Sequence, residues 1–272
     1  MRLTLSTLGC PDWTLETICE RAREYGFEGV DFRGVGDAVD VTTLPAFSDR
    51  AGETRAMLDA AGLETSALGS SIHVCDPHDD ETLAAAERYV AAARALDAPF
   101  VRVFGGGDAD ARSREELAAV AGDTMDAILS IPGADEVTWM VETHDNWTSS
   151  EDCLTLLDRL PGEVDILWDV GHTARVGGES PAETLDALGD DIRYVHLKDA
   201  VCEPDHPDAM DDGWRYVLPG EGELPLATAL DALDERGYDG WVMFEHEKRW
   251  HPELAEPEVA YPAFLEWFES VR

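Results

Sequence analysis

The stretch WMVETHDNW, residues 139–147, begins as a buried strand and ends in ionisable side chains. Trp139, Met140 and Val141 are typical of an apolar interior, whereas Glu142 and His144 follow where the strand leaves that interior. Side chains alternate between the two sides of a strand, so Glu142 and His144 are expected to point the same way. A buried carboxylate without a partner is costly. We therefore expect a cation beside Glu142, with further ligands from other parts of the chain.

Similar short apolar runs recur along the whole chain and alternate with amphipathic stretches. Strands are expected at residues 2–6, 27–32, 64–68, 99–104, 137–143, 164–169, 192–198 and 240–246. Helices are expected at residues 13–25, 49–61, 79–97, 113–130, 150–160, 181–188, 224–236 and 258–271. Within this pattern, SREE at residues 113–116 has the spacing of a helix capping box.

Strict alternation of strands and helices predicts a parallel sheet. Eight such pairs in 272 residues predict a single (β/α)8 TIM barrel that occupies residues 1–272 as one domain. An open, doubly wound sheet is the alternative, but the first turn, STLGCPDWT at residues 6–14, lacks the glycine-rich dinucleotide fingerprint. The longest stretch without a strand or helix pattern, residues 200–223, is expected to form an irregular loop over one barrel mouth.

The composition is strongly acidic, with 20 basic and 58 acidic residues and a formal net charge of −38. Lys198 and Lys248 are the only lysines. Such a surface repels phosphate backbones and anionic lipid, which argues against nucleic-acid and membrane partners. An acid-rich, lysine-poor surface is typical of proteins from salt-loving cells, where salt screens the self-repulsion. We therefore interpret the charge as a solvated halophilic surface.

The cysteines and the N-terminal segment favour a cytoplasmic protein. The five cysteines are odd in number and contain no CxxC pair, which argues for a reducing compartment. The segment MRLTLSTLGC has no apolar run of signal-peptide length, and no later run approaches the length of a membrane span.

Polar side chains recur at the ends of the last four expected strands of the barrel. Glu142, Asp169 and His196 follow one another at intervals of 27 residues, and Glu245 comes 49 residues after His196. In a barrel these strand ends meet at the C-terminal mouth, where active sites lie. Three carboxylates and one imidazole favour one hard or borderline divalent ion, with Mn²⁺ preferred and Mg²⁺, Co²⁺ or Zn²⁺ as alternatives.

An ordered set of motifs resembles the xylose isomerase-like TIM barrels, the sugar phosphate isomerase/epimerase group. The motifs are STLGCPDWTLE at 6–16, VETH at 141–144, DVGH at 169–172, HLKD at 196–199, GEGELP at 220–225 and FEHEKRW at 244–250. The resemblance implies that Glu142, Asp169, His196 and Glu245 bind one divalent metal and that His172 contacts a substrate oxygen. The epimerases also have a substrate-binding arginine shortly after the strand-seven histidine. Here the nearest cation is Lys198, which is expected to take that role.

These residues predict a metal-dependent sugar or sugar phosphate isomerase or epimerase. A divalent ion stabilises the enediolate that forms when a proton leaves the carbon beside a carbonyl. Glu142 and Glu245 are the expected catalytic base and acid. The partner is then a small carbohydrate, and a homo-oligomer is left open. The same ligands also suit a dehydratase of an inosose-like keto polyol.

Two further alternatives are less favoured. An endonuclease IV-like phosphodiesterase needs a metal cluster and a basic groove, which the charge of −38 opposes. A non-catalytic sugar-binding barrel is disfavoured by the intact set of ligands.

Other polar residues have two interpretations each. His144 either binds substrate or supports Asp169 from behind, and we favour the support. The segment FGGGD, residues 104–108, is expected to be a turn rather than a phosphate loop. Arg102 is expected in a polar layer inside the barrel, and His246 in packing. Lys248 is expected to stand beside a metal ligand.

The acidic surface predicts that stability depends on salt. We expect the thermal unfolding midpoint to climb well beyond the range of ordinary screening as KCl is raised to molar concentration, because cations screen the repulsion among carboxylates. Circular dichroism melts measure this midpoint. A midpoint that stays flat from low to molar KCl would remove the halophilic interpretation.

Overall fold

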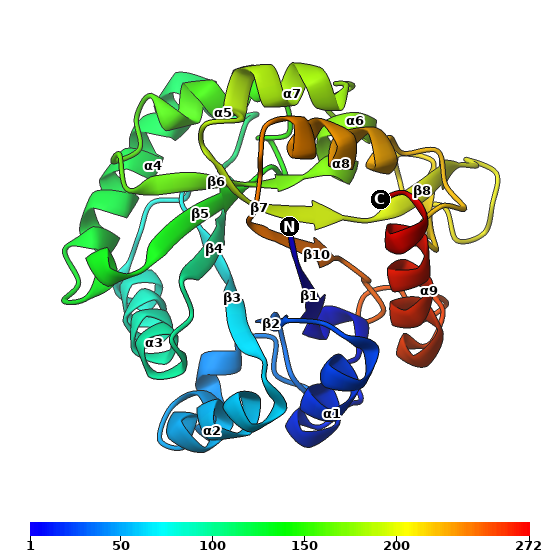
Figure 1. Ribbon diagram of the computed structural model, residues 1–272. Coiled ribbons are helices and arrows are strands. Elements are labelled where there is room, and N and C mark those ends of the chain that lie inside the picture. The colour runs from blue at the N-terminus through cyan, green and yellow to red at the C-terminus, as the bar shows by residue number, and fades with distance from the viewer.

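A computed structural model describes residues 1–272 and forms a closed barrel of eight parallel strands (Figure 1). The strands of the barrel are β1 Arg2–Ser6, β2 Gly29–Phe32, β3 Glu64–His73, β4 Phe100–Phe104, β5 Thr138–Glu142, β6 Val164–Asp169, β7 Ile192–Leu197 and β10 Trp241–Phe244. β1 pairs with both β2 and β10, which closes the sheet. The predicted TIM barrel is therefore confirmed.

Helices surround the barrel and follow the strands in order. They are α1 Leu15–Tyr25, α2 Ala51–Ala61, α3 Asp80–Leu96, α4 Arg114–Leu129, α5 Ser150–Leu157, α6 Val170–Arg175, α7 Pro181–Leu188, α8 Leu226–Glu235 and α9 Pro257–Ser270. Short 3₁₀ turns are η1 Thr7–Gly9, η2 Val41–Thr43, η3 Pro45–Phe47 and η4 Ala134–Glu136. The capping box at Ser113 is confirmed, since its hydroxyl accepts the Glu116 N–H while the Glu116 carboxylate accepts the Ser113 N–H.

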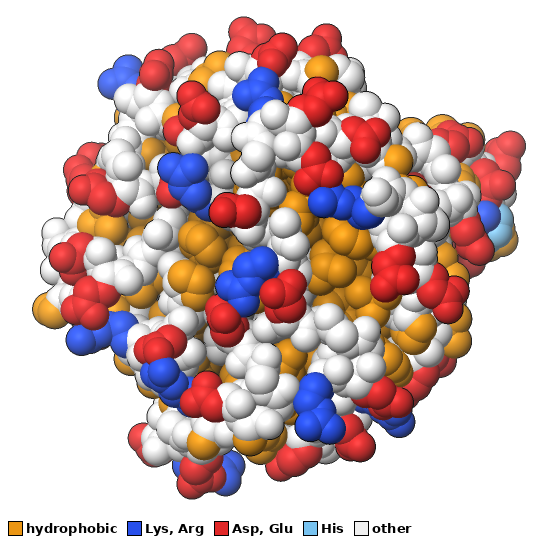
Figure 2. All heavy atoms as spheres, in the orientation of Figure 1, with side chains coloured by type: hydrophobic (Ala, Val, Ile, Leu, Met, Phe, Trp, Pro, Cys, Tyr) orange, Lys and Arg blue, Asp and Glu red, His pale blue; other side chains and the backbone are white.

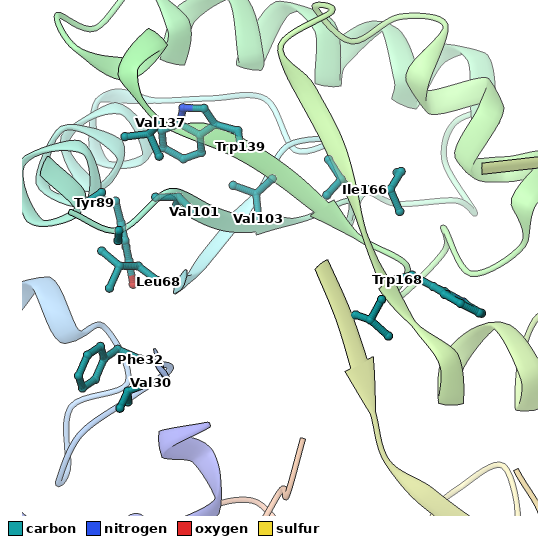
Figure 3. Close-up of a cluster of buried hydrophobic side chains, with 14 of the residues drawn as sticks. Val30, Phe32, Leu68, Tyr89, Val101, Val103, Val137, Trp139, Ile166 and Trp168 are labelled. Atoms are coloured by element: carbon teal, nitrogen blue, oxygen red, sulfur yellow. The ribbon is translucent and has the colours of Figure 1, made fainter. Parts of the chain in front are cut away.

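Two hydrophobic cores lie on opposite sides of the sheet. The larger core fills the space between strands and helices, and Figure 3 shows part of it, including Val101, Val103 and Trp139. A smaller core fills the barrel interior with Ala67, Met140, Leu167, Tyr194, Trp241 and Met243. Side chains alternate along a strand, so the next inward-facing residue comes two positions later. On β5, β6, β7 and β10 that residue lies one layer closer to the C-terminal mouth.

The segment expected as an irregular loop contains a β-hairpin, so that prediction is wrong. β8 Asp199–Cys202 and β9 Trp214–Val217 pair antiparallel with each other and not with the barrel. The strands are short and a proline-rich polar stretch separates them, which hides their alternation in the sequence. The buried Asp199 carboxylate accepts backbone N–H groups from Ala200, Gly220, Gly222 and Leu224, and this holds the hairpin against the following segment.

Acidic side chains are spread over the face of the molecule that Figure 2 displays, with fewer basic ones between them. On this face the negative charge is therefore dispersed and not gathered in one patch. None of the helices has the length and apolar character needed to cross a membrane.

The glycine-rich segment after β4 forms a tightly packed turn. Gly106 and Gly107 have φ angles of +66° and +87°, which favour glycine. The fully buried Trp147 packs against Gly105, and its indole N–H donates to the Gly106 carbonyl at 3.0 Å. This contact connects the loop after β4 to the loop after β5, which contains the polar residues of the stretch 139–147.

A methyl group at Gly105 should destabilise the protein. A Cβ there would lie 2.0 Å from the Trp147 ring, so Gly105→Ala should cost about 1–3 kcal/mol, the usual cost of overpacking. Gly52 is the matched control because it lies in α2 with no atom within 4 Å of an added Cβ. Gly52→Ala should be neutral or stabilising by up to about 1 kcal/mol. Urea unfolding of both variants measures the difference, and equal midpoints would contradict this packing.

Candidate metal centre

The structure brings the four predicted ligands together at the C-terminal mouth. One side-chain atom from each of Glu142, Asp169, His196 and Glu245 lies within 4.8 Å of the others, and all four residues are buried. Asp169 and His196 are paired neighbours on β6 and β7, and Met243 of β10 pairs with His196 two residues before Glu245. The closeness of the four side chains thus follows from the register of the strands.

The arrangement leaves several buried polar atoms without a hydrogen bond. They are Glu142 Oε2, Asp169 Oδ2 and both ring nitrogens of His196. His196 Nδ1 lies 3.3 Å from Glu245 Oε1, 3.6 Å from Glu142 Oε1 and 4.0 Å from Asp169 Oδ2. Buried polar groups are normally satisfied. Three carboxylates and an imidazole facing one point therefore fit a divalent cation.

Two buried basic side chains compensate part of the negative charge. Arg102 Nε lies 3.1 Å from Glu142 Oε2. Lys198 Nζ lies 2.9 Å from Asp169 Oδ2 and 2.8 Å from Glu247 Oε1, and it also donates to Glu245. Arg102 is in the polar layer where it was expected, but its ion pair with Glu142 was not predicted.

The ionisation of the carboxylates reflects burial opposed by these cations. Burial alone would raise the pKa of Glu142, but Arg102 and His196 outweigh it and hold that pKa well below its usual range. For Asp169 burial dominates and raises the pKa to about 7, although Lys198 acts in the opposite direction. Burial likewise opposes the charge on Lys198, yet Asp169, Glu245 and Glu247 hold its pKa above the ordinary value.

His172 lies beside the four candidate ligands and is neutral. Its backbone N–H donates to Asp169 Oδ1 at 2.9 Å, so Asp169 also caps α6. Its Nδ1 lies 2.9 Å from the Thr143 carbonyl, which can only accept, and Nδ1 therefore carries the proton. Burial, with Lys198 adding to it, lowers the pKa of His172 well below the ordinary value. Its Nε2 is left as a hydrogen-bond acceptor.

His144 lies at the edge of the same cluster but does not support Asp169. Its Nδ1 is 2.7 Å from Asp145 Oδ1, and its ring packs edge-on against His172 with centroids 4.6 Å apart. It makes no hydrogen bond or ion pair with Asp169, so the predicted support is wrong. Burial opposes protonation, but the hydrogen bond that His144 Nδ1 donates to the Asp145 carboxylate raises the pKa of His144. Its partial exposure leaves the outer edge of the ring open.

Other residues near the mouth were missed or misjudged. The hairpin places Tyr216 with its ring centroid 5.5 Å from Lys198 Nζ and 5.4 Å from Arg175 Cζ. Neither Tyr216 nor Arg175 belongs to a motif that the sequence made visible. Lys248 Nζ donates to the carbonyls of Pro252 and Leu254. It therefore stabilises the loop before α9 and does not face the candidate ligands.

The barrel and its mouth define a class of protein, a TIM barrel with a candidate site for a divalent metal. The chain belongs to the xylose isomerase-like TIM barrel family, whose sequence profile matches residues 19–271. The resemblance of the motifs is thereby confirmed over nearly the whole chain.

Individual relatives are more distant. An inosose dehydratase of Lacticaseibacillus casei is 28% identical over 137 residues, which cover 46% of this chain and 45% of that protein. The chain thus matches less than half the length of this curated relative. A structure described as "IOLI protein with a binding zinc atom" has a TM-score of 0.80 at 17% identity and covers 100% of this chain and 98% of its own. D-psicose 3-epimerase of Clostridium cellulolyticum H10, solved with D-tagatose, has a TM-score of 0.76 at 13% identity, with coverage of 100% and 98%. At these identities the two structures support the fold alone.

Removal of one candidate ligand should abolish tight metal binding. We expect His196→Ala and Asp169→Asn to weaken Mn²⁺ binding by more than about 100-fold. Even the loss of a residue that only hydrogen-bonds to a metal ligand lowers metal affinity by about 10–100-fold. His246→Ala is the control, since His246 is buried near the same mouth but bonds to the Ala255 carbonyl. Metal content by mass spectrometry and titration calorimetry measure the effect. Equal loss of metal in all three variants would point to general destabilisation instead.

Proposed function

We propose that the protein is a metal-dependent enzyme that moves a proton at the carbon beside a carbonyl in a small polyhydroxylated substrate. Its product is then an isomer or epimer of a sugar or sugar phosphate. The observation that carries this proposal is the buried group of three carboxylates and one imidazole at the C-terminal mouth. Membership of the xylose isomerase-like family and the fold shared with an epimerase support it.

We propose that Glu142, Asp169, His196 and Glu245 hold one divalent ion, with Mn²⁺ preferred over Mg²⁺, Co²⁺ and Zn²⁺. Oxygen-rich donor sets of this kind favour Mn²⁺. When bound, the ion supplies Lewis acidity, which polarises a substrate carbonyl and makes the neighbouring C–H more acidic.

Glu142 and Glu245 are the proposed proton-transfer groups. They lie at the ends of different strands, so they can approach a substrate from different directions. Arg102 fixes the carboxylate of Glu142, and Lys198 donates to the carboxylate of Glu245. Each base is therefore oriented by a buried cation, as efficient proton transfer requires.

The histidines and Lys198 are the proposed substrate contacts. His172 Nε2 is free to accept a hydrogen bond from a substrate hydroxyl, because Nδ1 carries the proton. His144, whose pKa is raised against the effect of burial by the hydrogen bond that it donates to Asp145, can donate a second hydrogen bond from its partly exposed ring. Lys198 Nζ, between Asp169, Glu245 and Glu247, can donate to a substrate oxygen beside them. These contacts would orient the carbon that loses its proton.

Dehydration of a keto polyol is the second candidate. The sequence similarity to inosose dehydratases favours it. In this reaction a proton leaves the carbon beside the carbonyl and the hydroxyl on the next carbon departs as water after protonation. The ammonium group of Lys198 lies beside Glu245 and could supply that second proton. The same proton abstraction therefore begins both reactions, and the fate of the hydroxyl separates them.

Proton abstraction should depend on both glutamates. We expect Glu142→Gln and Glu245→Gln to lose about 10²–10⁴ in turnover, the usual contribution of general acid–base catalysis, because glutamine keeps an oxygen but cannot accept the proton. Keto sugars, sugar phosphates and inososes are incubated with Mn²⁺ in D₂O, and proton NMR follows exchange, epimer formation or loss of water. Glu256→Gln is the control, since Glu256 is exposed and pairs with Lys248. Variants that retain metal and near-normal exchange would show that the glutamates are ligands only.

A further inference from the structure

Arg33, the residue directly after β2, is buried without an acidic partner. Arg33 is 8% exposed, and no carboxylate oxygen lies within 4.0 Å of its guanidinium. The side chain makes a single long hydrogen bond, from Nη1 to the Val39 carbonyl at 3.4 Å. In a chain with 58 acidic and 20 basic residues, a lack of available carboxylates does not explain this.

The other buried cations near the mouth are all compensated. Arg102 pairs with Glu142, and Arg175 pairs with Asp212 at 2.7 Å. Lys198 contacts three carboxylates. Among the buried arginine and lysine residues, Arg33, Arg102 and Lys198, only Arg33 thus lacks a carboxylate partner.

The guanidinium of Arg33 lies within the mouth and not behind the sheet. A narrow cavity of about 10 Å³, the space of about one water molecule, is lined by Arg33, Arg102 and the buried Asp31 together with the candidate ligands His196 and Glu245. Arg33 Cζ also lies 6.0 Å from the centre of the Phe104 ring. A group bound at Arg33 would therefore belong to the same molecule, or the same pocket, as a substrate held at the metal centre.

Gly69 on β3 makes room for the two guanidinium groups. A Cβ at this position would lie 2.8 Å from Arg33 Cδ and 3.2 Å from Arg102 Nη2. Any larger residue would push Arg33 or Arg102 aside. The absence of a side chain at Gly69 thus makes room for both arginines, of which only Arg102 pairs with a carboxylate.

An uncompensated buried charge is costly, so a compensating group from outside is favoured. Burial, together with the neighbouring Arg102, lowers the pKa of Arg33 to about 10, and the side chain still remains charged at neutral pH. The unused N–H groups of a guanidinium form a planar fork that matches the oxygens of a carboxylate or phosphate.

We propose that Arg33 binds an oxyanion group of the substrate, a carboxylate or a phosphate, with Arg102 beside it. This inference rests on the proposed function for the rest of the substrate. It assigns recognition of the anion to Arg33 and not to Lys198, whose charge three carboxylates already balance. The substrate is then an anionic keto compound rather than a neutral sugar.

Binding of inorganic phosphate and of acetate tests the proposal without turnover. Titration calorimetry is run at one ionic strength on the Mn²⁺-loaded protein and on Arg33→Met, Arg33→Lys and Arg88→Met. We expect at least about 10-fold weaker binding for Arg33→Met, the usual effect of losing a charged hydrogen bond, and a smaller loss for Arg33→Lys. Arg88→Met is the charge-matched control, because Arg88 pairs with Asp40 and is partly exposed. Preference for phosphate or acetate distinguishes a sugar phosphate from a keto acid.

Thermal melts give a second readout. In anion-free buffer Arg33→Met should melt at or above the wild-type temperature, because it removes an unpaired buried charge, and added phosphate or acetate should raise the wild-type midpoint only. A wild-type protein that binds neither anion, or an Arg33→Met variant that binds as tightly, overturns the proposal. So does a clear loss of stability in anion-free Arg33→Met. If anion binding depends on Arg33 but no keto compound exchanges its proton, the proposed reaction fails while the anion site stands.

Discussion

The alternation of side chains along parallel strands is the constraint on which the rest of this structure depends. On β5, β6, β7 and β10 the inward positions first hold an apolar layer and then, two residues later, the candidate ligands. A closed barrel has no other place for these side chains, since the opposite face packs against helices. The polar layer is thus supported from below by apolar packing, which keeps water out and fixes the positions of the carboxylates.

Concentrating three carboxylates in such a place requires compensation. The structure shows two sources of it in the chain, the guanidinium of Arg102 and the ammonium of Lys198. These two cations face four carboxylates, those of Glu142, Asp169, Glu245 and Glu247, and both ring nitrogens of His196 lack a hydrogen bond. A divalent ion would complete the balance. The electrostatics of the mouth and the proposed metal therefore follow from one requirement, that buried charge be paired.

The sequence predicted the barrel and the candidate ligands because both follow from short-range periodicity. Strand ends recur at regular intervals, and a carboxylate at the end of an apolar run is visible without a structure. The hairpin at residues 199–217 escaped because its strands pair only with each other. The pairing of Arg102 with Glu142 escaped because register between strands far apart in sequence decides which inward side chains meet. The prediction that His144 supports Asp169 failed because His144 bonds instead to its neighbour Asp145 and packs against His172.

The difference between Lys198 and Arg33 shows how a structure changes the interpretation of a cation. In the sequence Lys198 is prominent, as one of two lysines in a very acidic chain, whereas Arg33 is one of many arginines. In the structure Lys198 is the more fully paired of the two, and Arg33 lacks any acid. A paired cation orients the groups that it contacts, while an unpaired buried cation is still able to gain from a ligand. Rarity in the sequence is therefore weaker evidence for ligand binding than an unbalanced charge inside the fold.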